Sequence, residues 1–315
     1  CSFPFPDGPF SPVGTRGRPR YDPLARQPVE RLQLEVQELL QHSLAPRTHS
    51  LYRRAWNIYQ EFCTLHGFGD PLFSSLQSLV QFIAFLSING YASTTIASYV
   101  SGIASSLRLA GSPDITKHFI VKRLLESSRR LDSRRDLRRP ITFSILRRIV
   151  PALDSICTNQ FEAQLFRAAF LFAFFGFLRV GEFTAKSKHV VSPLRHSDVS
   201  LQVAPTGRVV VLNVRFSKTN QYGRGCFITI PECSQGDFAL CPVRAAAQFL
   251  SVLRPHCSSF FSHFNGDPVT RSQFTAVLQR SLDFVGLGDM RFSSHSFRIG
   301  AATSAAMSGI PEADI

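Results

Sequence analysis

The sequence predicts a mainly α-helical protein in two parts, a helical bundle followed by an α+β domain with a small antiparallel sheet. The chain of 315 residues is long enough for two domains of ordinary size. Apolar residues recur at helical spacing through most of it, and a hydrophobic content of 44% allows sizeable cores. Two β-rich runs stand together, at residues 209–216 and 226–230, and they predict the sheet.

The charge balance indicates a polyanionic partner. Lys and Arg number 35 against 22 Asp and Glu, which gives a formal net charge of +13. Nearly all of this excess is arginine, which holds phosphate through two parallel hydrogen bonds. We therefore expect double-stranded DNA as the partner rather than an anionic membrane surface. A merely soluble basic protein is the alternative.

The cysteines argue against secretion and against a metal centre. They number seven and contain no CxxC pair, which does not fit a disulfide framework and indicates a reducing compartment. Cys241, His256, Cys257 and His263 could supply metal ligands, but the spacing leads us to expect no metal and no cofactor. The most apolar run, residues 168–178, is too short to span a bilayer. No secretory signal is visible, so the expected location is nuclear in a eukaryote, or cytoplasmic with the DNA.

Residues 1–28 are rich in proline, glycine and arginine, and they predict a disordered basic leader. Residues 29–128 carry short apolar stripes at helical spacing, which predict a compact bundle of four or five helices. The expected helix starts are Val29, Thr48, Ser74 or Ser75, Thr94 or Thr95, and Asp114. Glycines at positions 67, 90 and 111 are expected to end three of these helices.

An arginine-rich linker is expected over residues 129–140, ending at Pro140. Its composition favours a basic strap lying across DNA, and a solvated helix end is the alternative. The exposed faces of the helices holding Arg53, Arg54 and Tyr99 are candidates for base readout, and the sequence does not select among them. The expected DNA-contacting residues are Arg53, Arg54, Arg129, Arg130, Arg134, Arg135, Arg138 and Arg139.

Residues 141–315 are expected to form the second domain. Thr142 is a plausible cap for a helix through Ile149, and residues 161–177 form a strongly apolar helix. The two β-rich runs flank a polar, turn-forming stretch, which predicts a hairpin with Lys218 near its turn. Further helices are expected at residues 242–253, at residues 271–285 and from residue 294 onward.

Four residues of this domain suit phosphodiester chemistry: Arg179, Lys218, His295 and Arg298. Two guanidinium groups can hold the non-bridging oxygens and stabilise a pentavalent transition state. A lysine can protonate the leaving oxygen, and a histidine can share proton transfer. His295 and Arg298 are three residues apart and share a face of a helix. Each residue alone has an ordinary structural explanation, such as a solvated helix end. The prediction depends on the four residues occurring together in this order and spacing.

In these residues the chain resembles the tyrosine recombinase (phage integrase-like) family, over about residues 30–315. Gly176-Phe-Leu-Arg-Val-Gly-Glu182 is similar to the family's first-arginine motif, in which Gly-Leu-Arg-x-x-Glu is usual. His295-Ser-Phe-Arg298 matches its HxxR motif, and Lys218 matches its hairpin lysine. Phe297-Arg-Ile-Gly-Ala-Ala302 looks closest to mobile-element recombinases of the DIRS or Crypton type.

The resemblance implies that residues 29–128 are a core-binding (SAM-like) domain that clamps DNA, and that residues 141–315 are a catalytic domain. It implies attack of a tyrosine on DNA, a 3′-phosphotyrosyl intermediate and rejoining without a metal. It also implies a homo-oligomer, which in the family is a tetramer.

The departure from the family concerns the nucleophile. The six tyrosines stand at positions 21, 52, 59, 91, 99 and 222, and none follows the HxxR motif. We expect the chain, which begins with Cys1, to be a fragment whose nucleophilic tyrosine lies beyond Ile315. The predicted function is DNA binding and site-specific recombination or integration of a mobile element. A non-catalytic, domesticated DNA-binding protein is the alternative, and a helical scaffold without nucleic acid is a third.

Overall fold

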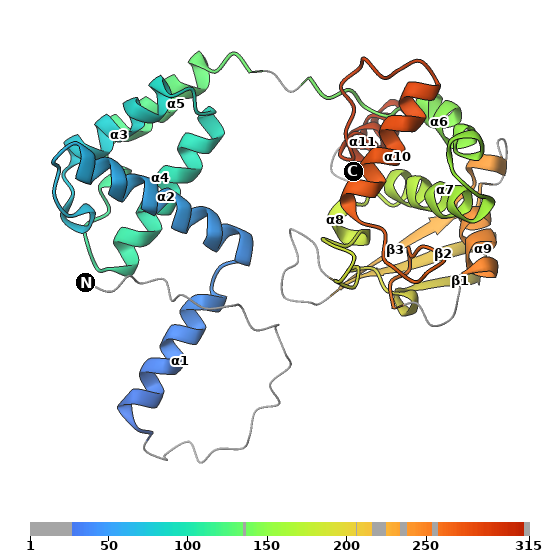
Figure 1. Ribbon diagram of the computed structural model, residues 1–315, viewed down its shortest axis with the longest axis horizontal. Coiled ribbons are helices and arrows are strands. Elements are labelled where there is room, and N and C mark those ends of the chain that lie inside the picture. The colour runs from blue at the N-terminus through green and yellow to red at the C-terminus, as the bar shows by residue number, and fades with distance from the viewer. Residues whose placement is uncertain are drawn as a thin grey trace. The chain divides into compact units, whose positions relative to one another are not determined.

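The computed structural model describes residues 27–134, 137–205, 207–215, 225–233, 238–253 and 258–311. The chain divides after Arg135 into two compact units, which are described separately below. Figure 1 shows that the described strands all belong to the second unit and that helices make up most of both. A mainly helical chain with a three-stranded antiparallel sheet confirms the predicted fold class.

The described part of the first unit is a set of α-helices joined by short turns. Its helices are α1 (Val29–His42), α2 (Pro46–Leu65), α3 (Leu76–Ile88), α4 (Ser93–Leu109) and α5 (Phe119–Leu131), with 3₁₀ turns η1 (Pro71–Phe73) and η2 (Ile115–Lys117). The core lies where α2, α3 and α4 meet, and Trp56, Tyr59 and Phe82 are among its largest fully buried side chains. Gly102 allows α2 and α4 to approach closely, because a Cβ there would lie 3.0 Å from that of Ala55.

Helix α1 is amphipathic but buries none of its side chains within the described residues. The apolar stripe that predicts this helix is present, and each of its side chains is at least 39% exposed: Val29, Leu32, Val36, Leu39 and Leu40. The stripe therefore forms no part of the first unit's core.

Two of the predicted helix starts in this unit are wrong, and a third is displaced by a residue. Helix α2 begins at Pro46, before Thr48, because proline is preorganised for the first helical position. Asp114 caps η2, and α5 begins only at Phe119. Helix α4 begins at Ser93, whose backbone N–H donates to Asp132 Oδ2 at 2.8 Å. Ser75 caps α3 as predicted.

The second unit surrounds its sheet with helices. Its elements are α6 (Phe143–Ile156), α7 (Gln160–Phe175), α8 (Val180–Phe183), η3 (His196–Asp198), β1 (Val199–Ala204), β2 (Gly207–Val214), β3 (Cys226–Pro231), η4 (Phe238–Leu240), α9 (Pro242–Val252), α10 (Arg271–Phe284) and α11 (Ser296–Met307). Thr142 caps α6 as predicted, but the helix continues past Ile149 to Ile156 with Pro151 inside it. Helix α7 ends at Phe175, two residues before its predicted end.

The sheet has the order β1–β2–β3 with antiparallel pairing throughout. The two predicted runs form β2 and β3, while β1 was not predicted. Helix α9 lies against all three strands (Figure 1). Along β2, the side chains of Val210, Leu212 and Val214 alternate inward and are buried, so one face of the sheet contributes to the core.

Phenylalanine dominates the core of the second unit. Phe183 of α8, Phe274 of α10 and Phe297 of α11 are each fully buried and form a chain of ring contacts, with centroids 5.2 Å and 5.7 Å apart. Phe170 of α7 contacts both Phe274 and Phe297. Each such ring contributes roughly 2–3 kcal/mol through burial. None of the helices in the described parts of the chain has the length and apolar character needed to cross a bilayer.

Candidate functional site

The segment between α7 and α8 places the first candidate residue. The sequence predicted an apolar helix that runs to residue 177, just before Arg179, but α7 ends at Phe175 and Arg179 is the N-cap of α8. The chain turns through Gly176 and Phe177, which buries Leu178 and leaves the Arg179 side chain 31% exposed. Arg179 therefore stands at the start of a new helix rather than at the solvated end of an old one.

Phe177 has an unusual backbone conformation. Its φ is 50°, the left-handed region, and no other non-glycine residue in the described segments has a positive φ. This position follows the helix end at Gly176, where a left-handed residue is common and is usually glycine. For a residue with a Cβ this conformation costs roughly 1–2 kcal/mol. The surrounding structure holds it, since Phe177 packs against the core of its unit.

Glu182 fixes Arg179 through two hydrogen bonds. Its Oε2 accepts from the Arg179 backbone N–H at 2.8 Å, and its Oε1 accepts from Arg179 Nη1 at 3.0 Å. Glu182 is buried, with 8% of its surface exposed, so this is a covered ion pair with charge-assisted hydrogen bonds. Sequence analysis quoted Glu182 in a motif but did not assign it to the site. The three-residue spacing in Arg-x-x-Glu was the available signal.

The second arginine lies in the first turn of α11. His295 is the N-cap of this helix and is exposed, while Phe297 is fully buried in the phenylalanine cluster. The buried ring orients the helix, so that Arg298 lies beside the segment before α8. Gly300 allows the chain to pass close by, because a Cβ there would overlap the backbone of Ile141. The Ile141 backbone N–H also donates to the Ser296 carbonyl at 2.9 Å.

Arg298 is held by the unusual turn. Its Nη1 donates to the carbonyl oxygen of Phe177 at 2.8 Å. Burial lowers the pKa of Arg298, the charge of Arg179 lowers it further, and Glu182 opposes both. Arg298 therefore reaches the turn that precedes Arg179, where the charges of Arg179 and Glu182 act on its pKa in opposite directions.

The structure thus brings two of the four predicted residues into one charged cluster and places the third, His295, three residues from Arg298. Lys218 lies outside the described residues, as does Tyr222. On the described side of that segment, Arg215 at the end of β2 donates to Asp198 Oδ1 at 2.6 Å.

The arrangement suits the capture of an oxyanion. Arg179 and Arg298 carry two charges and Glu182 neutralises one, so the cluster keeps an excess positive charge. Each guanidinium uses part of its donor fork on a protein acceptor and retains further N–H groups. Partial burial strengthens attraction to an anion. Two such groups can hold the non-bridging oxygens of a phosphodiester.

The candidate DNA contacts of the first unit are less restrained. Arg54 of α2 and Arg129 and Arg130 in the last turn of α5 are exposed. Arg53 is half-buried, with its Nε covered. Tyr99 is only 3% exposed and packs against Tyr91, so its side chain is not part of the exposed face of its helix.

The predicted linker residues form hydrogen bonds at both of its described ends. Arg134 donates through Nε to Asp132 Oδ1 at 2.8 Å and through Nη1 to the Gly90 carbonyl. Arg139 donates its backbone N–H to the Arg291 carbonyl at 2.8 Å. Arg138 is exposed, and Arg135 lies outside the described residues. Because α5 continues to Leu131, the predicted linker starts within a helix.

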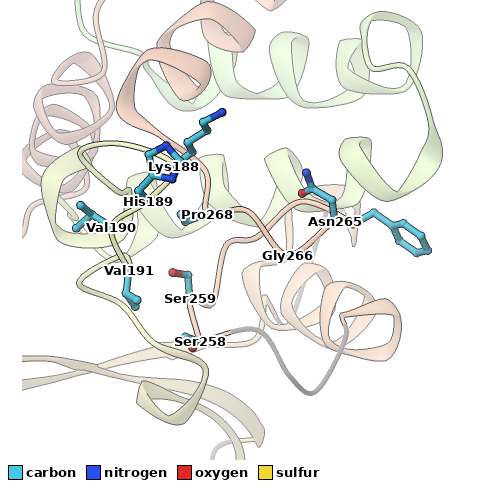
Figure 2. Close-up of a pocket in the computed structure, with 10 residues that line it drawn as sticks. Lys188, His189, Val190, Val191, Ser258, Ser259, Asn265, Gly266 and Pro268 are labelled. Atoms are coloured by element: carbon cyan, nitrogen blue, oxygen red, sulfur yellow. The ribbon is translucent and has the colours of Figure 1, made fainter.

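A surface depression of about 400 Å³ lies elsewhere on the second unit, between residues 188–191 and 258–268. Figure 2 shows Lys188 and His189 extending from its rim while Asn265 lies on the opposite side. Its polar side chains do not converge on one point, so it indicates no particular ligand. Sequence analysis did not identify it.

No group of three metal-ligand side chains occurs among the residues that the structure describes. Cys241 is fully buried, and His263 Nδ1 lies 3.5 Å from Glu162 Oε1. His256 and Cys257 lie outside the described residues.

Comparison with known proteins gives one sequence relative and a consistent group of folds. No family model matches the chain. An integrase/recombinase XerD homologue from Selenomonas ruminantium is 25% identical over 295 residues, which is 89% of this chain and 80% of the relative.

Three solved structures illustrate the shared fold. The Tn1549 transposon integrase (residues 82–397) with circular intermediate DNA has a TM-score of 0.57, with 13% identity over 89% of this chain and 87% of that one. A λ integrase (75–356) dimer on a COC′ core site has a TM-score of 0.55, with 16% identity over 91% and 92%. The XerH recombinase on a palindromic difH substrate has a TM-score of 0.56, with 13% identity over 89% and 74%.

Proposed function

We propose that this chain, a member of the tyrosine recombinase/integrase family, binds double-stranded DNA and holds one phosphodiester between Arg179 and Arg298 for site-specific recombination. The observation that carries the proposal is the anchored pair itself. Glu182 holds Arg179, the Phe177 carbonyl holds Arg298, and the cluster keeps a net positive charge. If the site were only a structural ion pair, one arginine would be enough to balance the single carboxylate of Glu182.

Within this proposal each residue has a chemical role. Arg179 and Arg298 bind the non-bridging oxygens and stabilise charge that develops at phosphorus. His295, exposed at the start of α11, shares proton transfer or donates to the phosphate, and Lys218 protonates the leaving oxygen. Residues 29–128 act as the core-binding part, and residues 141–315 carry the phosphate site.

The remaining DNA contacts are proposed for the exposed arginines of the first unit and the linker. The formal net charge of +13 supports a binding mode in which several phosphates are neutralised. A λ integrase tetramer bound to a Holliday junction is among the structures with this fold, and a homo-oligomer is proposed for this chain by analogy. The motif Phe297-Arg-Ile-Gly-Ala-Ala302 supports an origin in a mobile element of the DIRS or Crypton type.

Strand cleavage needs a nucleophile. No tyrosine of the printed sequence follows His295 and Arg298. For residues 1–315 we therefore propose DNA binding and phosphate capture. The phosphotyrosyl step is proposed for a protein in which a tyrosine follows this motif. A non-catalytic DNA-binding role, the second candidate, keeps the same site and lacks that step.

DNA binding is tested by titrating the chain with a duplex at several salt concentrations. Arg179→Ala and Arg298→Ala are compared with Arg244→Ala, which removes the same charge from α9, where the side chain contacts Glu232 and Phe238. We expect each site variant to lower the slope of log affinity against log salt by about 0.9. Binding without salt dependence, or site variants equal to Arg244→Ala, would overturn the proposal.

The two candidate functions are separated with a nicked duplex that traps a covalent intermediate. Residues 1–315 are expected to bind this duplex without forming a covalent complex. A covalent complex would instead place a nucleophile within the printed sequence, and peptide mapping would identify it.

A further inference from the structure

We propose that Phe177 is a positioning residue, whose left-handed backbone directs its carbonyl oxygen to Arg298 and so sets the place of the second guanidinium. The inference rests on the proposed phosphate site and deepens it. It follows from three observations on the segment between α7 and α8: the φ of 50°, the 2.8 Å hydrogen bond from Arg298 Nη1, and the packing of the phenyl ring.

The first step concerns the backbone. A residue directly after a helix can continue in the right-handed region or turn into the left-handed one, and this choice rotates its carbonyl group. Phe177 takes the left-handed region although it has a bulky side chain. The helix end just before Phe177 is closely packed, because a Cβ at Gly176 would lie 2.8 Å from the Phe172 carbonyl oxygen. The direction of the Phe177 carbonyl is therefore fixed by a tightly packed helix end.

The second step concerns Arg298. An arginine side chain has several rotatable bonds, and a free guanidinium loses much conformational freedom when it binds phosphate. The Phe177 carbonyl accepts one of its N–H groups and removes part of that freedom before any ligand arrives. A carbonyl carries no full charge, so it orients the guanidinium without neutralising it, unlike the carboxylate of Glu182 toward Arg179. Arg298 therefore keeps its charge for an anion.

The third step concerns the two arginines together. Phe177 and Arg179 are two residues apart on the same turn, and Leu178 between them is buried. Because the acceptor for Arg298 and the backbone of Arg179 belong to one rigid segment, the turn sets the spacing of the two guanidinium groups. The two non-bridging oxygens of a phosphodiester require a particular spacing of the two guanidinium groups, so the turn helps to determine which ligand fits.

The test uses substitutions that separate backbone conformation from side-chain packing. Phe177→Gly and Phe177→Asn remove the ring but tolerate the left-handed region, whereas Phe177→Val keeps apolar volume and disfavours that region. If conformation matters, the glycine and asparagine variants bind duplex DNA with the wild-type affinity. The valine variant then binds up to about tenfold more weakly, because Arg298 must be ordered on binding, while its salt slope stays near that of the wild type because Arg298 keeps its charge. If packing alone matters, valine is the least affected of the three, and this order would overturn the proposal.

Two further measurements keep the result interpretable. The double variant Phe177→Val with Arg298→Ala is expected to bind no more weakly than Arg298→Ala alone, because both changes remove the same contact. Additive losses would contradict a shared contact. Thermal unfolding gives the highest temperature at which every variant is still folded. DNA binding by the variants is compared below that temperature.

A readout without DNA separates failure of this inference from failure of the proposed function. Nitrogen-15 NMR of the Arg298 guanidinium reports whether its Nη protons are held in slow exchange. We expect resolved Nη signals in the wild type, the glycine variant and the asparagine variant, and averaged signals in the valine variant. If the protein does not bind DNA but this pattern holds, the proposed function fails and the positioning role stands. Averaged signals in the wild type would overturn the positioning role itself.

Discussion

The arginines of the second unit's site and those on the surface of the first unit differ in how they are held. Arg179 and Arg298 are partly covered, and each donates to a protein acceptor. Arg54, Arg129 and Arg130 are exposed on helices. Ordering a long side chain on binding costs free energy, so a held guanidinium supplies position while an exposed one supplies mainly charge. The same residue type therefore serves two tasks, and the acceptors decide which.

The largest effect is expected from breaking the support of the held pair. Gly300→Ala places a methyl group against the backbone of Ile141 and should lower the free energy of unfolding of the second unit by about 3 kcal/mol. Urea unfolding measures this. Gly181→Ala is the matched control, because nothing lies within 4 Å of a Cβ there. Equal stability of the two variants would mean that the approach of Ile141 to α11 is not tight in solution.

The next largest effect, on DNA affinity, is expected from removing the carboxylate that binds Arg179. Glu182→Gln keeps the shape but removes the charge that fixes this guanidinium, and we expect DNA affinity to fall about tenfold. Net charge alone predicts the opposite sign, because losing a carboxylate makes the protein more basic. Glu126→Gln makes the same charge change at an exposed pair with Arg123 and should bind slightly more tightly. Titration of both variants with duplex DNA shows whether the position of Arg179 or the net charge of the protein has the larger effect on affinity.

A smaller effect is expected from the exposed arginines. Arg130→Ala should lower the salt slope by about 0.9 if it contacts a phosphate, and should change stability by no more than about 0.5 kcal/mol. Arg54→Ala should behave in the same way. The measurements are DNA titrations at several salt concentrations and thermal unfolding. A large loss of stability in either variant would mean that its arginine is held by the fold, and the difference between the two groups of arginines would then be smaller than described above.

The smallest effect concerns pH and the first unit. Hydrogen bonds from Arg134 and Ser93 hold the pKa of Asp132 well below its usual 3.8. A lowered pKa means that the charged form stabilises the fold above the unfolded pKa and that this contribution disappears as pH falls through the folded pKa. We expect Asp132→Asn to be less stable than the wild type at neutral pH, with the difference shrinking below about pH 3.8. A difference that persists in strong acid would assign the effect to shape rather than charge.

Local patterns in the sequence predicted much of the fold. Strong apolar periodicity located α6, α7, α9, α10 and α11, and runs rich in β-branched residues located β2 and β3. The β1 run, Val199–Ala204, was missed although Val199, Leu201 and Val203 alternate with Ser200 and Gln202, a spacing of two that is typical of a strand. The start of α4 was also misplaced, since its N-terminal N–H bonds to Asp132, which lies 39 residues away.

The candidate site was partly visible in the sequence. The motifs around Arg179 and Arg298 named both arginines, and in the structure Arg298 donates to the backbone two residues before Arg179. What held them was not visible. A left-handed conformation at Phe177 contradicts the preference of a bulky residue, and a backbone carbonyl as acceptor leaves no trace in residue type. Lys218 and Arg135 stay predictions, because they lie outside the described residues.

The phenylalanine cluster has a consequence for how the second unit opens. Phe183 supports α8 and Phe297 supports α11, and both rings contact Phe274. Elements that share one set of buried contacts exchange their amide hydrogens together, through cooperative unfolding, rather than one at a time. The backbone beneath both arginines should therefore resist hydrogen exchange to the same extent as the centre of α7, and the site should disappear only when the whole domain melts.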